Sequence, residues 1–436
     1  MEISPVSTGG SPSGLAERPA TPAVAAHHPS GRDLPGHLDA VRGRLRALIA
    51  TSASYATETV DTLLDFAHAV GTSDMHLQPT RNGLDVRFRY DGVLQPVSLI
   101  PAGGTSSVTA RLKVLADLLT YKNDIPQEGR IEKPRHGREI RVSTFPTMHG
   151  ERAVLRFFGH DREFTTLDEL GNPPQVTARI RDALVETSGA MLISGPAGSG
   201  KSTTLYACLR HLVTSTKGSR SIVSIEDPIE VPVEGVAQSQ VDLAAGFDLK
   251  TGLRSLMRQD PEVIMVGEIR DRDTAEFAIQ ASLTGQLLLA TFHSDTAASA
   301  ITRLIEMGIE PFLIRSGLIT VVTQRLLRTL CSHCSRESSD QADLCGIEVD
   351  RARAPVGCGH CHGTGYSGRA MISEFLDVRG DQIGKAILRK ADSRELYRIA
   401  IDNGMSPLFM QARSLIRDGR TSPAEVWRVL GTAVRA

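Results

Sequence analysis

The sequence predicts an α/β protein with a smaller α+β domain and a cysteine-rich insert, and one observation supports each of these three parts. A glycine-rich segment stands between a strand-like apolar run and a helix-compatible run within residues 190–209. An earlier stretch, residues 73–157, alternates apolar and polar residues as half-buried strands do. Two cysteine pairs with C-x-x-C spacing follow within residues 331–361. The chain has 436 residues, too many for one ordinary core, so we expect two or three domains.

The overall composition restricts the class of protein. Hydrophobic residues make up 41% and charged residues 23%, which are ordinary values for a soluble protein. The formal net charge of -1 provides no general attraction to nucleic acid, so no direct nucleic-acid partner is expected. The sequence contains no apolar run of roughly 20 residues and no secretory signal at its start. We therefore expect a soluble, cytoplasmic protein.

The beginning of the chain has the composition of an unstructured segment. Residues 1–36 are rich in proline, glycine, serine and alanine and contain no aromatic residue. Such a segment cannot bury enough apolar surface to offset its ordering entropy, so we expect a disordered tail. Residues 37–50 then predict an amphipathic helix, which either packs on its own domain or docks on a partner. Its apolar face is formed by Leu38, Val41, Leu45 and Leu48.

Residues 37–165 are expected to form a small α+β domain. A second amphipathic helix is predicted over residues 57–70. The Asn82-Gly83 turn between alternating segments is a strong signal for a β-hairpin. Helical spacing returns at residues 105–119, and two more strands are predicted over residues 138–143 and 152–157.

The glycine-rich segment predicts a nucleotide-binding loop, because it reads G-x-x-x-x-G-K-S between a strand and a helix. Glycines let consecutive backbone N–H groups turn toward phosphates, and the helix N-terminus favours negative charge. Lys201 would reach the β- and γ-phosphates, and the Ser202 hydroxyl would bind Mg²⁺. The chain is therefore predicted to bind ATP or GTP. The nucleotide-binding residues are expected to be Gly195, Pro196, Ala197, Gly198, Ser199, Gly200, Lys201, Ser202 and Thr203.

Polar residues follow three later strand-like runs. Glu226 ends the first run, Glu268 follows the second and His293 follows the third. Ligands of open α/β sheets bind beyond the carboxyl ends of the strands, so these side chains should meet near the phosphates. Hydrolysis needs one carboxylate to activate water, another to hold Mg²⁺ and a donor that senses the γ-phosphate. The predicted catalytic residues are Lys201, Glu226, Glu268 and His293.

The four paired cysteines predict a structural zinc site in an insert at residues 331–361. Two C-x-x-C pairs are a typical ligand set for tetrahedral Zn²⁺, and the metal would pin a loop that otherwise lacks a core. Four free thiols or a redox disulfide are the alternatives, and nearby histidines could replace a thiolate. Cys208 and Cys345 fit no pattern. The predicted zinc ligands are Cys331, Cys334, Cys358 and Cys361.

Together these motifs resemble those of the ATPases of type II secretion and type IV pilus assembly. The resemblance covers about residues 57–430. In the nucleotide-binding part it is carried by residues 195–206, 224–230, 253–271, 281–285 and 291–294. In the smaller domain it is carried by residues 73–77, 86–93, 126–130 and Arg141-Val-Ser.

The resemblance implies a RecA-like ATPase domain over residues 172–436 and an ATP-hydrolysing motor that assembles a pilus or a secretion pseudopilus. It implies ATP, Mg²⁺ and Zn²⁺ as cofactors, a homohexameric ring and an inner-membrane platform protein as partner. It places Glu226 as the water-activating glutamate, Glu268 near Mg²⁺ and His293 in the histidine box. A DNA-uptake or conjugation motor and a catalytically silent ring are the alternatives. Arginines expected to reach the phosphates are Arg87, Arg89, Arg141 and Arg156.

The sequence also departs from the family pattern in three places. Gly267 stands where a Walker B strand often carries aspartate, so the two glutamates would share the acidic work. Ser294-Asp295 stands where the family more often has Thr-Asn. Longer relatives carry an extra N-terminal docking domain, and only the tail and one helix occupy that place here.

The four-cysteine insert is typical of assembly motors rather than retraction motors, so it favours subunit extrusion.

Overall fold

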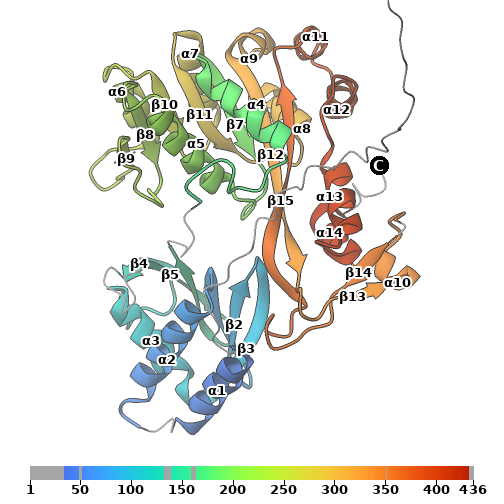
Figure 1. The fold of residues 1–436 in the computed structure, drawn as a ribbon. Coiled ribbons are helices and arrows are strands. Elements are labelled where there is room, and N and C mark those ends of the chain that lie inside the picture. The colour runs from blue at the N-terminus through green and yellow to red at the C-terminus, as the bar shows by residue number, and fades with distance from the viewer. Residues whose placement is uncertain (1–33, 49–51, 132–138, 159–163, 350, 432–436) are drawn as a thin grey trace, which may run out of the picture. The chain divides into compact units, whose positions relative to one another are not determined.

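A computed structural model describes residues 34–48, 52–131, 139–158, 164–349 and 351–431 (Figure 1). Most of the predicted disordered tail, residues 1–33, lies outside the described residues. Helix α1 (Leu34–Ala47) begins earlier than the predicted residue 37, inside the segment predicted to be tail. Pro35 is compatible with this start, because the first N–H groups of a helix have no intrahelical acceptor and its missing N–H costs nothing there.

The smaller domain contains one antiparallel sheet of six strands in the order β3-β2-β1-β6-β5-β4. The predicted hairpin at Asn82-Gly83 is confirmed, since it joins the first two strands. A Cβ on Gly83, whose φ is 138°, would lie 2.0 Å from the carbonyl oxygen of Ile100, so only glycine fits. The strands are β1 (Asp74–Thr80), β2 (Gly83–Tyr90), β3 (Val93–Pro101), β4 (Gln127–Ile131), β5 (Ile140–Thr147) and β6 (Gly150–Phe157).

Helices α2 (Tyr55–Ala69) and α3 (Thr105–Leu115) cover one face of this sheet, and Leu45 of α1 joins the same buried core. Strand β2 shows how the core is selected. Leu84, Val86 and Phe88 are buried, while Arg87 and Arg89 alternate with them on the polar face. The arginines therefore follow from the same period of two that makes the hydrophobic face.

The later part of the chain, from residue 174 on, contains a seven-stranded sheet in the order β15-β12-β7-β11-β10-β8-β9. All neighbours are parallel except the edge strand β15, which is antiparallel to β12. The predicted α/β fold class is confirmed. The strands are β7 (Gly189–Ser194), β8 (Ile222–Glu226), β9 (Ala237–Gln240), β10 (Val263–Val266), β11 (Leu287–Phe292), β12 (Leu318–Leu330) and β15 (Tyr366–Asp377).

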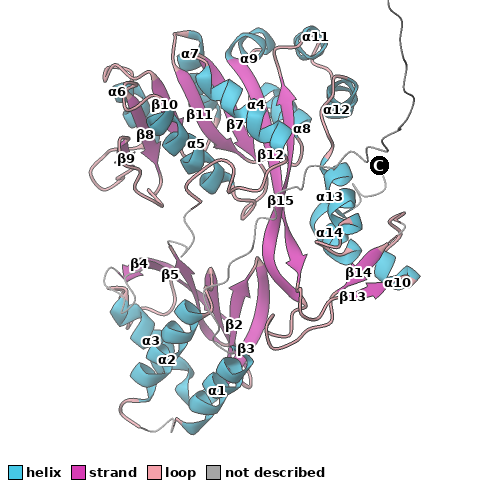
Figure 2. Ribbon diagram, viewed as in Figure 1, coloured by secondary structure: helices cyan, strands magenta, loops and turns pink. Residues whose placement is uncertain are grey.

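Helices cover both faces of this sheet, so its central strands are apolar on both sides (Figure 2). One face packs against α4 (Pro174–Val185) and α5 (Lys201–Ser215). The opposite face packs against α6 (Leu249–Leu256), α7 (Arg272–Leu283), α8 (Ala297–Glu306), α9 (Pro311–Gly317), α11 (Asp381–Leu388) and α12 (Ser393–Asp402).

The long strands β12 and β15 continue from the sheet to the cysteine insert (Figure 1). The insert contains β13 (Arg336–Ser338), α10 (Gln341–Leu344) and β14 (Ala352–Ala354), and α13 (Leu408–Arg417) and α14 (Pro423–Leu430) follow later in the chain. The expectation that the insert lacks a core is wrong. Ile347 and Ala352 are buried in one cluster with Leu408 and Ile416 of α13, so apolar packing as well as any metal holds this segment.

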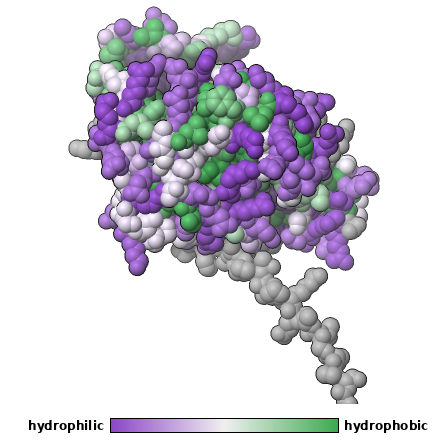
Figure 3. Space-filling model, turned by 90° about the horizontal axis from the view of Figure 1, so that it is seen from above, coloured by the Kyte–Doolittle hydropathy of each residue, from purple (hydrophilic) through white to green (hydrophobic). Residues whose placement is uncertain are grey.

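Among the described residues, no helix combines the length and the apolar character that crossing a bilayer requires. The surface instead mixes polar and apolar residues, and Figure 3 shows apolar groups gathered near the middle of the face seen from above. Exposed apolar side chains include Leu283 of α7, Phe312 of α9 and Leu388 of α11. Apolar residues of this number on a surface are ordinary for a folded protein.

Candidate nucleotide-binding site

The glycine-rich loop lies between β7 and α5 and requires its glycines. Gly195, Gly198 and Gly200 have φ values of 146°, 74° and 88°, in the region that side chains disfavour. A Cβ on Gly195 would lie 2.5 Å from the Ser199 hydroxyl and 2.6 Å from the backbone oxygen of Gln324. Gly200 is the N-cap of α5, so the loop leads directly into the helix N-terminus.

The loop has the donors that a phosphate needs. The first N–H groups of any helix lack intrahelical acceptors, and those of α5 face the loop end. Ser199 is 3% exposed, and within the described chain its Oγ has no hydrogen-bond partner. A buried hydroxyl left without a partner is uncommon and points to a ligand oxygen as its acceptor. These residues therefore fit a bound phosphate.

Lys201 extends back over the loop. Its Nζ donates to the carbonyl oxygens of Gly195 at 2.9 Å and Pro196 at 3.0 Å. Burial lowers the pKa of this ammonium, and the nearby carboxylate of Glu268 opposes that shift. The charge of Lys201 is thus held between the loop and the end of β10, where a triphosphate on the loop would meet it.

Glu226, the predicted water-activating residue, is 3% exposed at the end of β8. Its Oε1 accepts from Ser224 Oγ at 2.6 Å and from Gln238 Nε2 at 3.0 Å. Its Oε2 accepts from the Tyr206 hydroxyl at 2.5 Å. Burial and the Glu226 carboxylate raise the pKa of Tyr206, which therefore stays a donor. Both oxygens of Glu226 are committed to neighbouring side chains.

Glu230, four residues later in the same acidic segment, lies beside the loop instead. Solvent reaches Glu230, but the protein around its carboxylate desolvates it enough to raise its pKa. The Ser202 side chain and the positive charge of Lys201 both favour its ionised form and oppose part of this rise in pKa. Sequence reasoning missed this residue as a site residue, although it belongs to the Ser224–Glu230 segment on which the family resemblance rests.

The structure brings Glu268 and His293 into direct contact. His293 Nε2 lies 2.7 Å from Glu268 Oε1, and Arg270 Nε donates to Glu268 Oε2 at 2.6 Å. These side chains line a small pocket together with Phe292 and Arg303. Burial lowers the pKa of His293, and the positive charge of Lys201 adds to that effect. These two effects favour the neutral imidazole, and the contact with Glu268 orients the ring.

The predicted strand-end arrangement is thus present in this sheet. The end of β7, the end of β8, the end of β10 and the end of β11 are adjacent and point the same way. They place the glycine loop, two candidate glutamates and a histidine along one edge, where ligands of open α/β sheets bind.

Comparison with known proteins identifies the group to which this arrangement belongs. The model of the family described as type II/IV secretion system protein matches residues 50–428. Type II secretion system protein E of Pseudomonas aeruginosa is 42% identical over 378 residues, which cover 85% of this chain and 74% of that protein. The chain belongs to the type II/IV secretion system protein family. Type IV pilus assembly ATPase PilB of Thermus thermophilus is 40% identical over 81% of this chain and 41% of its own length.

Solved structures with a similar fold include an ATPase and a pilus retraction motor. The X-ray structure of the Legionella pneumophila ATPase DotB superposes with a TM-score of 0.60 at 21% identity, over 84% of this chain and 93% of that one. The pilus retraction motor PilT with bound ADP superposes with a TM-score of 0.56 at 22% identity, over 84% and 96% of the two chains. At these identities the similarity concerns the fold.

The predicted phosphate-binding arginines of this secretion system protein lie on the polar face of the antiparallel sheet. Arg87 pairs with Asp85 at 2.8 Å, and Arg156 pairs with Asp74 at 3.0 Å. Arg141 stands opposite Arg156 in the β5–β6 register. Asp74 also receives Arg89 at 3.3 Å. The face is strongly basic, and the role of these arginines toward phosphates stays a prediction.

The four paired cysteines of this family member form one cluster. Their sulfur atoms all lie within 4.8 Å of one another, and neighbouring Sγ atoms are 3.7, 3.8 and 3.9 Å apart. A tetrahedron of thiolates at about 2.3 Å from zinc has sulfur–sulfur distances of about 3.8 Å. The N–H of Gly365 donates to Cys361 Sγ at 3.1 Å, and the N–H of Gly357 donates to Cys334 Sγ at 3.3 Å. The cluster fits a tetrahedral zinc ion.

Proposed function

We propose that this type II/IV secretion system protein is an ATP-hydrolysing motor that powers assembly of a type IV pilus or a type II secretion pseudopilus. The names of relatives about 40% identical over most of the chain support this function. The single observation that carries it is the phosphate loop set beside Glu230, Glu268 and His293 at one edge of a parallel sheet.

In this proposal the loop N–H groups and the Ser199 hydroxyl bind the phosphates, and Lys201 moves from the loop carbonyls to the β- and γ-phosphates. Ser202 holds Mg²⁺, which supplies positive charge to the phosphate oxygens when it is bound. The residues from 195 to 203 thus form the binding part of the site. The loop is blind to the base, so the preference for ATP over GTP rests on the relatives.

We propose Glu230 as the carboxylate that orients the attacking water and accepts its proton. Glu230 is reachable by solvent, lies beside Ser202 and has a raised pKa, which makes its carboxylate a better base. Glu226 is buried, and Tyr206, Ser224 and Gln238 occupy three of the roughly four acceptor positions of its carboxylate, so it is poorly placed to accept a water. In this proposal Glu226 anchors the backbone at the end of β8, which positions Glu230 beside the glycine-rich loop.

Glu268 and His293 complete the site as a sensing pair. When Nε2 of neutral His293 donates to Glu268, Nδ1 is left as an acceptor, and a γ-phosphate or its water can exchange with this bond. Glu268 also lies near enough to Lys201 to stabilise its charge. The pair would therefore respond to the presence of the terminal phosphate.

The remaining parts of the proposal follow from the same relatives. The motor works as a homohexameric ring in the cytoplasm and acts peripherally at the inner membrane on a platform protein. Cys331, Cys334, Cys358 and Cys361 bind structural Zn²⁺ at the far end of β12. Arg87, Arg141 and Arg156 contribute positive charge toward the nucleotide.

The test is Mg²⁺-dependent ATP hydrolysis by the purified, zinc-loaded protein, with Lys201→Ala as the inactive variant. The same variant is introduced into the source bacterium, and surface pili and secreted protein are measured. Hydrolysis and assembly that are both lost in Lys201→Ala support the motor. Assembly that survives Lys201→Ala would instead identify a catalytically silent ring, and a defect confined to DNA uptake would identify a DNA motor.

A further inference from the structure

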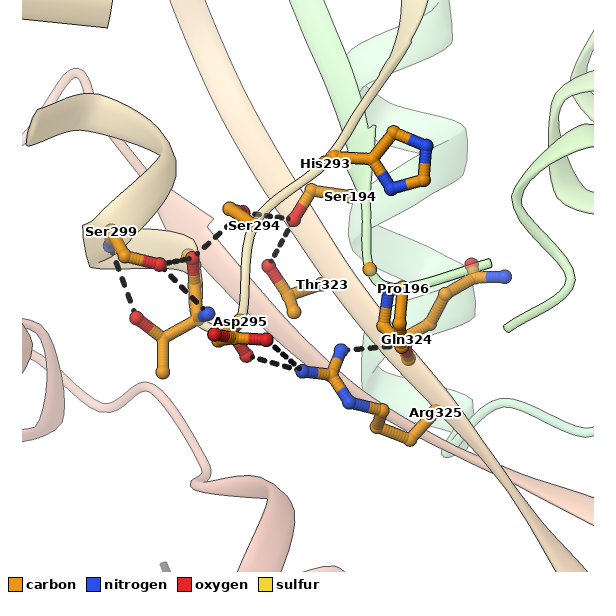
Figure 4. A network of polar contacts seen from close by, with 12 residues as sticks. Ser194, Pro196, His293, Ser294, Asp295, Ser299, Thr323, Gln324 and Arg325 are labelled. Carbon is orange, nitrogen blue, oxygen red and sulfur yellow. Dashed lines mark hydrogen bonds and ion pairs between the residues drawn. The ribbon is translucent and has the colours of Figure 1, made fainter. Parts of the chain in front are cut away.

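The phosphate loop follows strand β7, and the His293 segment follows strand β11. Both segments contact strand β12 (Figure 4). We propose that Gln324 and Arg325, consecutive residues of β12, are positioning residues that clamp these two segments at a fixed separation. Gln324 holds the phosphate loop and Arg325 holds the His293 segment. The inference rests on the proposed function, since it names what keeps the two halves of that site in register.

Gln324 is fully buried, and its amide spans the loop and the first turns of α5. Its Nε2 donates to the Ser199 carbonyl oxygen at 2.8 Å, and its Oε1 accepts from Thr204 Oγ1 at 3.0 Å. A Cβ added at Gly200 would lie 3.2 Å from Gln324 Nε2, so the loop packs directly on this amide. Tying the Ser199 carbonyl outward leaves the loop N–H groups facing the phosphate position.

Arg325 faces the other side of β12, because successive strand residues point to opposite faces. Its Nη2 donates to the backbone oxygen of Asp295 at 2.8 Å and lies 3.3 Å from the Asp295 carboxylate. Its Nη1 donates to the backbone oxygen of Gln324 at 3.1 Å. Asp295 is largely exposed, so the bond to its backbone carries more of the contact than the ion pair.

Hydroxyl groups strengthen the same connection on the Arg325 face. Ser194, the last residue of β7, lies 2.7 Å from Thr323 Oγ1 and 2.7 Å from Ser294 Oγ. Figure 4 shows these hydroxyl groups and Arg325 between Pro196 of the loop and Ser299 of α8.

The clamp predicts two different kinetic defects. Gln324→Met keeps the length of the side chain but leaves the Ser199 carbonyl without its donor, so the loop loosens. We expect its Kd for Mg-ADP to rise about tenfold, with little change in kcat at saturation. Arg325→Met releases the His293 segment, and we expect kcat to fall about tenfold with the Mg-ADP Kd within twofold of wild type.

Thr320→Val is the matched control, because Thr320 is a buried β12 residue whose hydroxyl donates to Leu376 away from the site. It should lower thermal stability without changing Kd or kcat. Arg325→Lys should restore part of kcat. If Gln324→Met fails to fold, Thr204→Val removes one bond of the same amide and should still weaken Mg-ADP.

The measurements are calorimetric Mg-ADP titration and steady-state hydrolysis on the full chain. Wild-type Kd in Gln324→Met and wild-type kcat in Arg325→Met, with both variants folded, would overturn the clamp. The clamp would also be overturned if every variant, including Thr320→Val, showed the same rise in Kd and the same fall in kcat. That result would mean that the substitutions act through general packing of β12. A wild-type chain that binds no Mg-ADP would instead contradict the proposed function.

Discussion

Replacing Glu226 should affect stability first, because its carboxylate holds three donors inside the protein. Tyr206, Ser224 and Gln238 donate to it at 2.5, 2.6 and 3.0 Å, and the residue is 3% exposed. In Glu226→Ala these donors lose their acceptor, and each unsatisfied buried group costs about 1–3 kcal/mol. Local rearrangement of the hydroxyls recovers part of this cost, so we expect a net loss of about 3 kcal/mol in the free energy of unfolding.

Urea unfolding of the nucleotide-binding domain, followed by circular dichroism, measures this loss. Glu230→Ala is the matched control, because Glu230 is a solvent-exposed carboxylate only four residues from Glu226. We expect its stability to change by less than about 0.5 kcal/mol while hydrolysis is lost. A Glu226→Ala protein as stable as wild type would refute the anchoring role, and Glu230→Ala with normal hydrolysis would return water activation to Glu226.

Three further predictions follow from other parts of the molecule. Cys334→Ser should lower bound zinc from one per chain to a substoichiometric level, measured by atomic absorption, and wild-type content would contradict a four-thiolate site. The acid limb of the kcat–pH profile should be shifted to higher pH than for an unperturbed glutamate, because desolvation raises the pKa of Glu230 and its base form is lost as pH falls through that pKa. An acid limb without this shift would count against Glu230. Lys113→Met should lower the free energy of unfolding, measured with urea, by about 3–5 kcal/mol, because it leaves the Glu151 carboxylate buried without its partner, which lies 2.9 Å away. An unchanged unfolding transition would show that the pair is not stabilising.

The local parts of the site were predictable from sequence. The backbone of the glycine loop has positive φ at Gly195, Gly198 and Gly200, which glycine adopts without strain. In the zinc site, C-x-x-C spacing places two thiols on each tight turn. Parallel strands with buried apolar sequences bring Glu268 and His293 to one edge wherever the sheet order allows it. These features depend on residues close together in the chain.

The parts that sequence reasoning missed depend on distant contacts. Glu226 and Glu230 share one acidic segment, and only the path after β8 shows which carboxylate faces Ser202. Gln324 donates a hydrogen bond to Ser199, which lies 125 residues earlier in the chain. No local sequence pattern predicts this contact. The insert also gained a core from α13, which lies far along the chain and supplies the apolar surface that the insert lacks on its own.

The most direct test of the account is steady-state ATP hydrolysis by the purified protein at high concentration, compared with Lys201→Ala, Glu230→Gln and Glu226→Gln. The account predicts Mg²⁺-dependent turnover that Lys201→Ala and Glu230→Gln abolish, whereas folded Glu226→Gln keeps a measurable rate. Turnover that persists in Lys201→Ala, or that only Glu226→Gln removes, would contradict it.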